Sequence, residues 1–204
     1  MLVEAGRGPI AAAAFALGCG GATPSTAPAR PPAELRGVAR YLPLEDGTVF
    51  SYETSTLPGN ERGLLVLEVR RPRADTAELV VAGRVQRLTI TPDAVAHAAG
   101  GFLLREPLVA GAQWHGDFGH VRVTRVDASV TVAAGTFAGC VETVEELATR
   151  ESEKHTTTTF CPGVGIALRE TEVEQGGEHQ SERIALKSFG KRFDANALGP
   201  ANKD

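Results

Sequence analysis

The chain has 204 residues, a length that fits one folded domain with flanking segments. Its apolar share of 42% is sufficient for a hydrophobic core. The formal net charge is −4, which excludes a generally basic nucleic-acid binder because such binding needs a concentrated basic surface. No run of about 18 apolar residues occurs, so no membrane-spanning helix is predicted.

The first 18 residues have the order of a secretory signal peptide. Arg7 supplies a positive charge, residues 10–17 form a short apolar run, and small residues surround Cys19. The sequence Ala-Leu-Gly-Cys resembles the lipobox of bacterial lipoproteins, which implies that Cys19 becomes the lipidated first residue of the mature chain. Plain secretion and a short buried alanine-rich helix are the alternatives.

Residues 19–40 are expected to form a flexible tether behind the lipid. Residues 20–32 are rich in Pro, Ala and Gly and contain no large apolar side chain, so they cannot offset their own ordering entropy. In bacterial lipoproteins an Asp after the lipidated Cys favours the inner membrane. Gly20 at this position therefore implies an outer-membrane anchor facing the periplasm. The predicted partner of this region is the membrane itself.

Residues 41–191 are predicted to form an all-β domain, with residues 192–204 as a flexible tail. Strand-forming runs recur at short intervals and turn residues separate them; the clearest runs are 49–54, 64–69, 77–82, 85–90, 121–126, 141–148, 154–160 and 166–174. Residues 94–99 are also interpreted as a strand. Gly83-Arg84 is a candidate tight turn, and the pairs Gly100-Gly101 and Gly176-Gly177 separate further strands. The pattern favours roughly eight to ten antiparallel strands in a curved sheet, half-open barrel or sandwich.

One short motif occurs twice, 64 residues apart. Pro43-Leu44-x-x-Gly47-x-x-Phe50 returns as Pro107-Leu108-x-x-Gly111-x-x-Trp114. Each copy has a proline that interrupts a strand, a glycine suited to a turn and an aromatic residue that opens the next strand. The repeat indicates either general turn chemistry or two similar halves of one sheet.

The two remaining cysteines are predicted to form a disulfide. If residues 141–148 and 154–160 form a hairpin centred between Arg150 and Glu151, Cys140 and Cys161 lie directly opposite each other. Opposed Cα atoms are then about 4.5–5.5 Å apart, within disulfide range. Two buried free thiols, or a Cys161 nucleophile with His155 as base, are the alternatives; His155 would lie about 20 Å away along the strand.

The region from 142 to 182 is rich in glutamate and therefore acidic. Glu142, Glu145, Glu146, Glu170, Glu172 and Glu174 are interpreted as a solvated outer face, or else as an attraction for cations or a basic partner. No aspartate-rich calcium loop is present. His115, Asp117 and His120 are the one cluster with metal-ligand spacing, but the two histidines converge only if Gly116 or Gly119 bends the chain. We predict neither a metal nor another cofactor.

Several segments together resemble the TapB-like family of bacterial exported β-proteins and lipoproteins. They are residues 41–52, with Phe50 where the family has Trp, Ala134-Gly135-Thr136-Phe137-x-x-Cys140, and Phe160-Cys161-Pro162-Gly163-Val164-Gly165. The resemblance implies a curved antiparallel sheet like that of lipoprotein carriers, and is nearly silent on activity.

Three functions remain open from the sequence. The first is a non-enzymatic, lipid-anchored scaffold or partner-binding module of the cell envelope. The second is a carrier of a lipid or other hydrophobic molecule in a concave sheet. The third is an envelope enzyme using His115, Asp117 and Glu142, although the common catalytic motifs are absent.

Overall fold

The structure is a computed structural model that describes residues 35–192. Predicted features at Cys19, in residues 1–34 and in residues 193–204 lie outside the described residues. The elements are α1 (Val38–Tyr41), β1 (Thr48–Leu57), β2 (Arg62–Arg73), β3 (Thr76–Val81), β4 (Arg84–Ile90), β5 (Ala94–His97), β6 (Phe102–Arg105), β7 (Gln113–His115), β8 (His120–Val132), β9 (Gly135–Ala148), β10 (Ser152–Cys161), β11 (Gly165–Gln175) and β12 (Glu178–Lys191).

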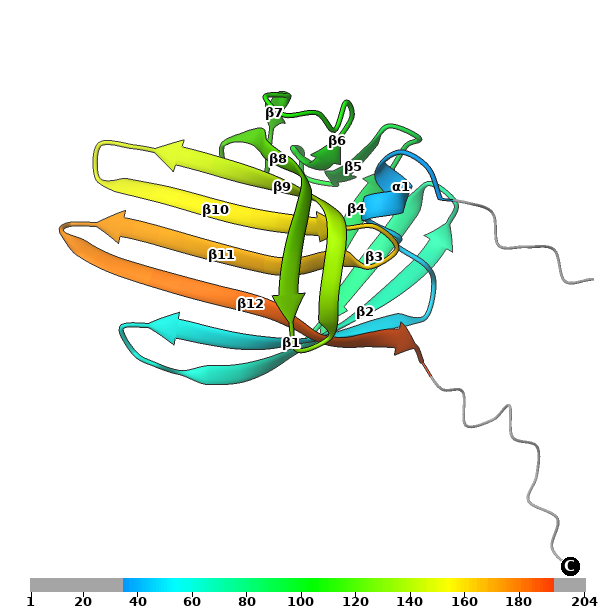
Figure 1. The fold of residues 1–204 in the computed structure, drawn as a ribbon, viewed down its shortest axis with the longest axis horizontal. Helices are drawn as coiled ribbons and strands as arrows, with labels where there is room; N and C mark the ends of the chain where they lie inside the picture. The colour runs from blue at the N-terminus through cyan, green and yellow to red at the C-terminus, as the bar shows by residue number, and fades with distance from the viewer. Residues whose placement is uncertain (1–34, 193–204) are drawn as a thin grey trace, which may run out of the picture. The chain divides into compact units, whose positions relative to one another are not determined.

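The described strands form one antiparallel sheet, in which nearly every strand pairs with its neighbours in sequence (Figure 1). The order runs β6-β5-β4-β3-β2-β1-β12-β11-β10-β9-β8-β7, so the pairing of β1 with β12 joins two six-stranded halves. The sheet curls until its two edge strands, β6 and β7, approach each other. The predicted all-β class and half-open barrel are confirmed. Twelve strands replace the expected eight to ten. β6 and β7 are too short to show a periodic pattern, whereas β5 lies within residues 94–99, for which the sequence predicts a strand.

A seam between β6 and β7 closes the curled sheet. The indole nitrogen Nε1 of Trp114 in β7 donates a hydrogen bond of 3.1 Å to the carbonyl oxygen of Phe102 in β6. Close by, Gly101 has a positive φ of 79°, and a Cβ atom there would overlap the carbonyl oxygen of Gly116. The two edges therefore touch through backbone as well as through a buried side chain.

The repeated motif opens each half of the sheet with the same turn. Gly47 donates its N–H to the Val69 carbonyl at 2.9 Å, and Gly111 donates to the Val123 carbonyl at the same distance. The i-to-i+3 hydrogen bonds also match, from Thr48 N to Glu45 O and from Ala112 N to Val109 O. Phe50 and Trp114 then enter the core. The repeated motif thus forms the same turn twice, as both interpretations of the repeat predict.

Most of the turns lie at the glycines where the sequence predicts them. Gly176 and Gly177 connect β11 to β12, and Gly100 and Gly101 lie between β5 and β6. The turn between β3 and β4 differs by one residue, because Ala82 and Gly83 hold the two positive φ angles, 48° and 79°, instead of Gly83 and Arg84. Two successive residues with positive φ suit the twist of a tight hairpin.

The hairpin of β9 and β10 has the register that the residue numbers predict. Phe160 pairs with Val141 and His155 pairs with Glu146. One step beyond this ladder, Cys140 and Cys161 are joined by a disulfide, with their Cα atoms 4.3 Å apart. Both cysteines are fully buried, so the cross-link lies within the core of the sheet.

Side chains fill the inner side of the sheet. The largest that are almost fully buried are Phe160, Leu88, Leu104, Leu186, Val69 and Val123, contributed by both halves. The far end of the β8–β9 hairpin crosses over β12 (Figure 1), where the Ala134 N–H donates to the Leu186 carbonyl at 3.1 Å. Phe137 and Phe189 pack edge to face at this crossing, with ring centroids 6.4 Å apart. The concavity expected from the sequence is therefore largely occupied.

The packed body starts before the expected boundary at residue 41. Val38 in α1 is 1% exposed and belongs to the core, and Leu42 directly after the helix is also buried. The chain enters α1 through Gly37, which has a φ of 59° and lies against Glu106 and the Pro92 carbonyl. This short helix places residues 35–41 against the ends of several strands.

Candidate functional site

A groove opens beside α1, and we call it the α1 groove. Its volume is about 430 Å³. The apolar side chains that line it are Leu35, Ala39, Leu42, Leu44, Ile90 and Val95, and the charged residues at its rim are Glu45, Asp46, Arg71 and Arg73. These residues come from α1, the segment that leads into β1, the β2–β3 turn and the β4–β5 turn. The groove therefore joins three separate parts of the sequence, residues 35–46, 71–74 and 90–95.

A second hollow, of about 700 Å³, continues the α1 groove along the helix. The two share Ala39, Arg71 and Ile90, among other residues. The continuation adds Arg36 and Glu106 to the charged rim. Together they form one open surface with an apolar floor.

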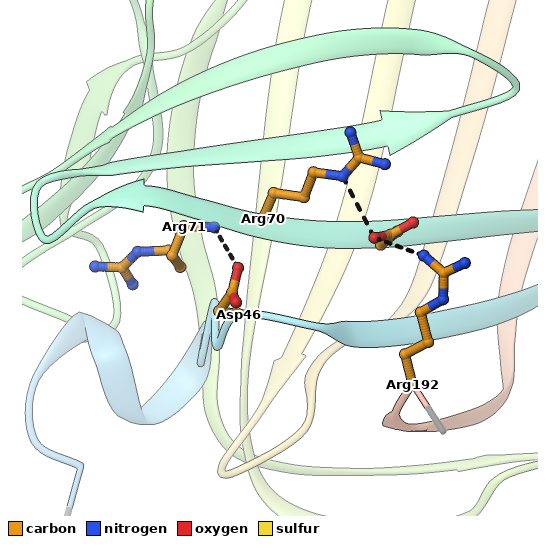
Figure 2. Close-up of polar contacts among 5 residues, drawn as sticks. Asp46, Arg70, Arg71 and Arg192 are labelled. Carbon is orange, nitrogen blue, oxygen red and sulfur yellow. Dashed lines mark hydrogen bonds and ion pairs between the residues drawn. The ribbon is translucent and has the colours of Figure 1, made fainter. Parts of the chain in front are cut away.

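Arg71 holds one wall of the groove in place (Figure 2). Its guanidinium donates to the Leu44 carbonyl at 2.9 Å and to the carbonyls of Arg73 and Ala74. Its backbone N–H donates to the carboxylate of Asp46 at 2.7 Å, as the dashed line between these residues shows. Hydrogen bonds from a charged donor are stronger than neutral ones. Arg71 thus fastens the β2–β3 turn to the start of β1.

The last described residues are fastened to the same place. Lys191 Nζ donates to the Asp46 carbonyl at 2.7 Å and forms an ion pair of 2.9 Å with Glu45. The Arg192 N–H donates to the Gly47 carbonyl at 2.8 Å. The Arg192 guanidinium donates a hydrogen bond to the carboxylate of Glu68, and Arg70 of β2 donates to the same carboxylate (Figure 2). The end of β12 therefore lies beside the groove.

The rim has two arginines that the fold itself does not engage in ion pairs. Arg36 and Arg73 are exposed, and among residues 35–192 neither forms an ion pair. Arg71, by contrast, is committed to backbone carbonyls. The same rim also carries Asp75 and Glu106, which form no ion pair with another described residue, so its charge is mixed. The apolar floor beside Arg36 and Arg73 can take a ligand that carries both an apolar group and a carboxylate.

The histidines singled out from the sequence meet across a hairpin. His115 ends β7, His120 begins β8, and the bend that brings them together contains Gly116 and Gly119. The ring centroids are 5.9 Å apart with an edge-to-face geometry. Asp117 lies in the intervening loop, and within the described part of the chain no group of three or more potential ligands is arranged to hold a metal ion.

The three residues considered for catalysis do not converge. Glu142 lies opposite Arg125, whereas Glu146, four residues further along β9, lies opposite His120. Four residues of strand separate these positions by about 13 Å. Glu142 instead accepts hydrogen bonds from Arg125 Nε at 3.1 Å and from Thr124 Oγ1 at 2.9 Å. It belongs to an ion pair that ties β8 to β9.

Three further glutamates of the acidic region, Glu145, Glu146 and Glu170, have structural partners of their own among the described residues. Glu145 accepts hydrogen bonds from the backbone N–H groups of Phe118 and Gly119, at 2.8 and 3.0 Å, and so holds the loop between the two histidines. Glu146 lies 3.7 Å from His155, and Glu170 pairs with Arg183 at 3.2 Å. This arrangement fits a solvated outer face in which charges are paired across strands.

The ion pair of Glu142 makes a testable prediction about pH. The hydrogen bond from Arg125 lowers the pKa of the Glu142 carboxyl below its ordinary value. A lowered pKa in the folded state contributes stability above the ordinary pKa, and this contribution disappears as the pH falls through the lowered value. We therefore expect the difference in unfolding free energy between wild type and Glu142→Gln to be constant near neutral pH and to shrink below about pH 4.5. Urea unfolding across this range measures it.

Glu174→Gln is the matched control, because Glu174 is exposed at the end of β11 and forms no ion pair with another described residue. Its stability difference from wild type is expected to stay small at every pH. If the difference in unfolding free energy between wild type and Glu142→Gln did not change with pH, the ion pair would not be the source of this stability.

One comparison with a solved structure supports the fold, and a second is reported beside it. A crystal structure of an exported protein from Bacteroides fragilis with a YmcC-like fold has a TM-score of 0.50 and 13% identity, and the match covers 74% of this chain and 99% of that chain. A lipoprotein from Parabacteroides distasonis has a TM-score of 0.48 and 12% identity, covering 74% and 98%. At such low identity the first likeness concerns the fold alone. No family model and no curated protein sequence matches the chain.

One further property of the described residues concerns membranes. None of the helices among residues 35–192 has the length and apolar character needed to cross a bilayer.

Proposed function

We propose that the protein is an exported, lipid-anchored β-domain of the bacterial cell envelope that binds a protein partner through the α1 groove. Three features support the anchor: the signal-like residues 1–18, the lipobox-like Cys19 and the tether that follows. The fold likeness to an exported protein of Bacteroides fragilis agrees with this location. The sequence resemblance to TapB-like proteins and the outer-membrane destination are parts of the same proposal.

The observation that carries the binding function is the composition of the α1 groove. Leu42, Ile90 and Val95 provide an apolar floor, and Arg36 and Arg73 stand unpaired at its rim among the described residues. An open surface made of two adjoining hollows accommodates a protein segment better than a compact cofactor. The segment that fits has a large apolar side chain close to an Asp or Glu.

The position of the groove also suits an anchored module. Leu35, the first described residue, lines the groove, so the predicted tether joins the body at this point. A partner bound here is held next to the tether, and the tether keeps it within reach of the membrane surface.

A carrier of hydrophobic molecules is the second candidate function. The filled core argues against a ligand inside the sheet, since Phe160, Leu186 and Leu88 occupy that space. A carrier would have to use the α1 groove instead, and its apolar floor is the observation that favours this role. Binding of a fluorescent fatty acid that is lost in a groove variant would support the carrier over the partner-binding module.

The anchor is tested by the mass of the native protein. We expect the chain extracted from membranes to begin at Cys19 and to carry a diacylglyceryl group, because the lipobox-like sequence directs cleavage before this residue. Intact-mass spectrometry of the native protein measures both properties. Cys19→Ser is expected to move the protein from the membrane fraction to the soluble fraction. An unmodified chain that is still membrane-bound would contradict the proposal.

The groove is tested by a charge placed on its floor. Ala39 is exposed on α1 and lines both hollows, so Ala39→Glu introduces a carboxylate without disturbing the core. Displayed random peptides selected on the wild-type protein are expected to combine a large apolar residue with Asp or Glu. Their Kd for Ala39→Glu should rise about tenfold or more, because the new charge is desolvated on binding and repels the peptide's acid.

Ala148→Glu is the matched control, since Ala148 is an exposed alanine at the end of β9 and is not part of the groove. It should leave the affinity unchanged. Selected peptides that bind both variants as tightly as wild type would show that the groove is not the binding site.

A further inference from the structure

The residues that follow β12 start at the α1 groove. Lys191 contacts Glu45 and Asp46, and both of these residues line the groove. The backbone of Arg192 is held by the Gly47 carbonyl at 2.8 Å. The next part of the chain is therefore anchored beside two charged residues of the groove.

The sequence of residues 193–204 matches the chemistry of the groove. The segment reads Phe-Asp-Ala-Asn-Ala-Leu-Gly-Pro-Ala-Asn-Lys-Asp and contains two large apolar residues, Phe193 and Leu198. Asp194 and Asp204 supply carboxylates that complement Arg36 and Arg73 at the rim. It is thus an apolar and acidic segment of the kind that the groove suits.

The length of the segment is also sufficient. Leu198 lies six residues beyond Arg192, which corresponds to about 20 Å of extended chain. Lys191 is held by Glu45 and Asp46, which both line the α1 groove, so this reach starts from the groove's own residues. The cost of ordering is low for a segment tethered at the site, because tethering gives a high local concentration.

We propose that residues 193–204 occupy the α1 groove as an intramolecular ligand, with Leu198 on the apolar floor. The segment shields this floor until a partner displaces it. This regulatory role rests on the proposed function of the groove, whereas the occupancy itself does not. A partner must then compete with the segment, and its apparent affinity falls by the fraction of molecules in which the groove is free.

Disulfide trapping in the full chain tests the occupancy. Ala74 lines the groove, so Ala74→Cys combined with Leu198→Cys is expected to form a cross-link under mild oxidation. Trypsin cleavage then yields residues 74–84 linked to residues 193–203, which mass spectrometry identifies. Val85→Cys with Leu198→Cys is the control, because Val85 is exposed on β4 and lies outside the groove. Equal cross-linking of the two pairs would overturn the proposal.

A second experiment separates this inference from the proposed function. The peptides selected on the wild-type protein are tested against Phe193→Ser/Leu198→Ser, a variant with no change in the packed body. If the segment is displaced on binding, the apparent Kd of this variant falls about tenfold relative to wild type. An unchanged Kd together with loss of binding in Ala39→Glu would reject the segment and keep the binding function. Trapping at Ala74 without any peptide binding would reject the binding function and keep the occupancy.

Discussion

Trp114→Ala is expected to destabilise the protein by about 3–5 kcal/mol, the cost typical of truncating a buried tryptophan. Trp114 is 6% exposed and belongs to the core. Its indole N–H also closes the seam by donating to the Phe102 carbonyl. The variant therefore loses packing and the polar link between β6 and β7 together. Urea unfolding followed by circular dichroism gives the free energy directly.

Trp114→Phe separates the two contributions. The phenyl ring retains most of the apolar contact but cannot donate a hydrogen bond, so we expect a loss of about 1–2 kcal/mol. If Trp114→Ala cost no more than this conservative change, the seam would not be a packed part of the body, and the assignment of β7 to the closed sheet would be wrong.

Removal of the cross-link between Cys140 and Cys161 is expected to cost about 3 kcal/mol, because the disulfide closes a loop of intermediate length in the unfolded chain. The double variant Cys140→Ala/Cys161→Ala suits the test, since both positions are fully buried and serine would leave hydroxyl groups there without solvent. Chemical unfolding of this variant and of the wild type under oxidising conditions measures the difference.

Reduction of the wild-type protein provides the control for the cysteine substitutions. The reduced wild type is expected to lose a similar free energy, and its mass should rise by about 2 Da when the cross-link opens. A wild type whose stability and mass are insensitive to a strong reductant under unfolding conditions would show that the two thiols are not linked.

The sequence predicts the sheet best where strands are long and turns are tight. The register of β9 with β10 follows from two strand-like runs around one turn. Side chains alternate between the two faces of a strand, so a shift of one residue would move the buried side chains to the solvent face, and few other registers remain. The repeated turn is predictable for the same local reason, since Pro43, Gly47 and their counterparts each restrict the backbone. Strands of three or four residues, such as β7, are too short for alternation to identify them.

The candidate site could not be predicted in this way. The α1 groove combines Leu35, Ala39 and Ile90 with the end of β2 and the turn after it, and only the tertiary fold brings these segments together. The hydrogen bonds of Arg71 go to backbone carbonyls, which carry no residue-specific signal. The one local signal is Val38, whose apolar side chain follows the Pro-rich residues and marks the start of the packed body.

The pairing of β1 with β12 sets the order in which the molecule can be completed. Thr48 pairs with Lys191, so the first strand finds one of its two neighbours only at the other end of the folded body. During folding, β1 keeps one edge unpaired until β12 is in place. Such a long-range contact favours slow, late closure of the sheet.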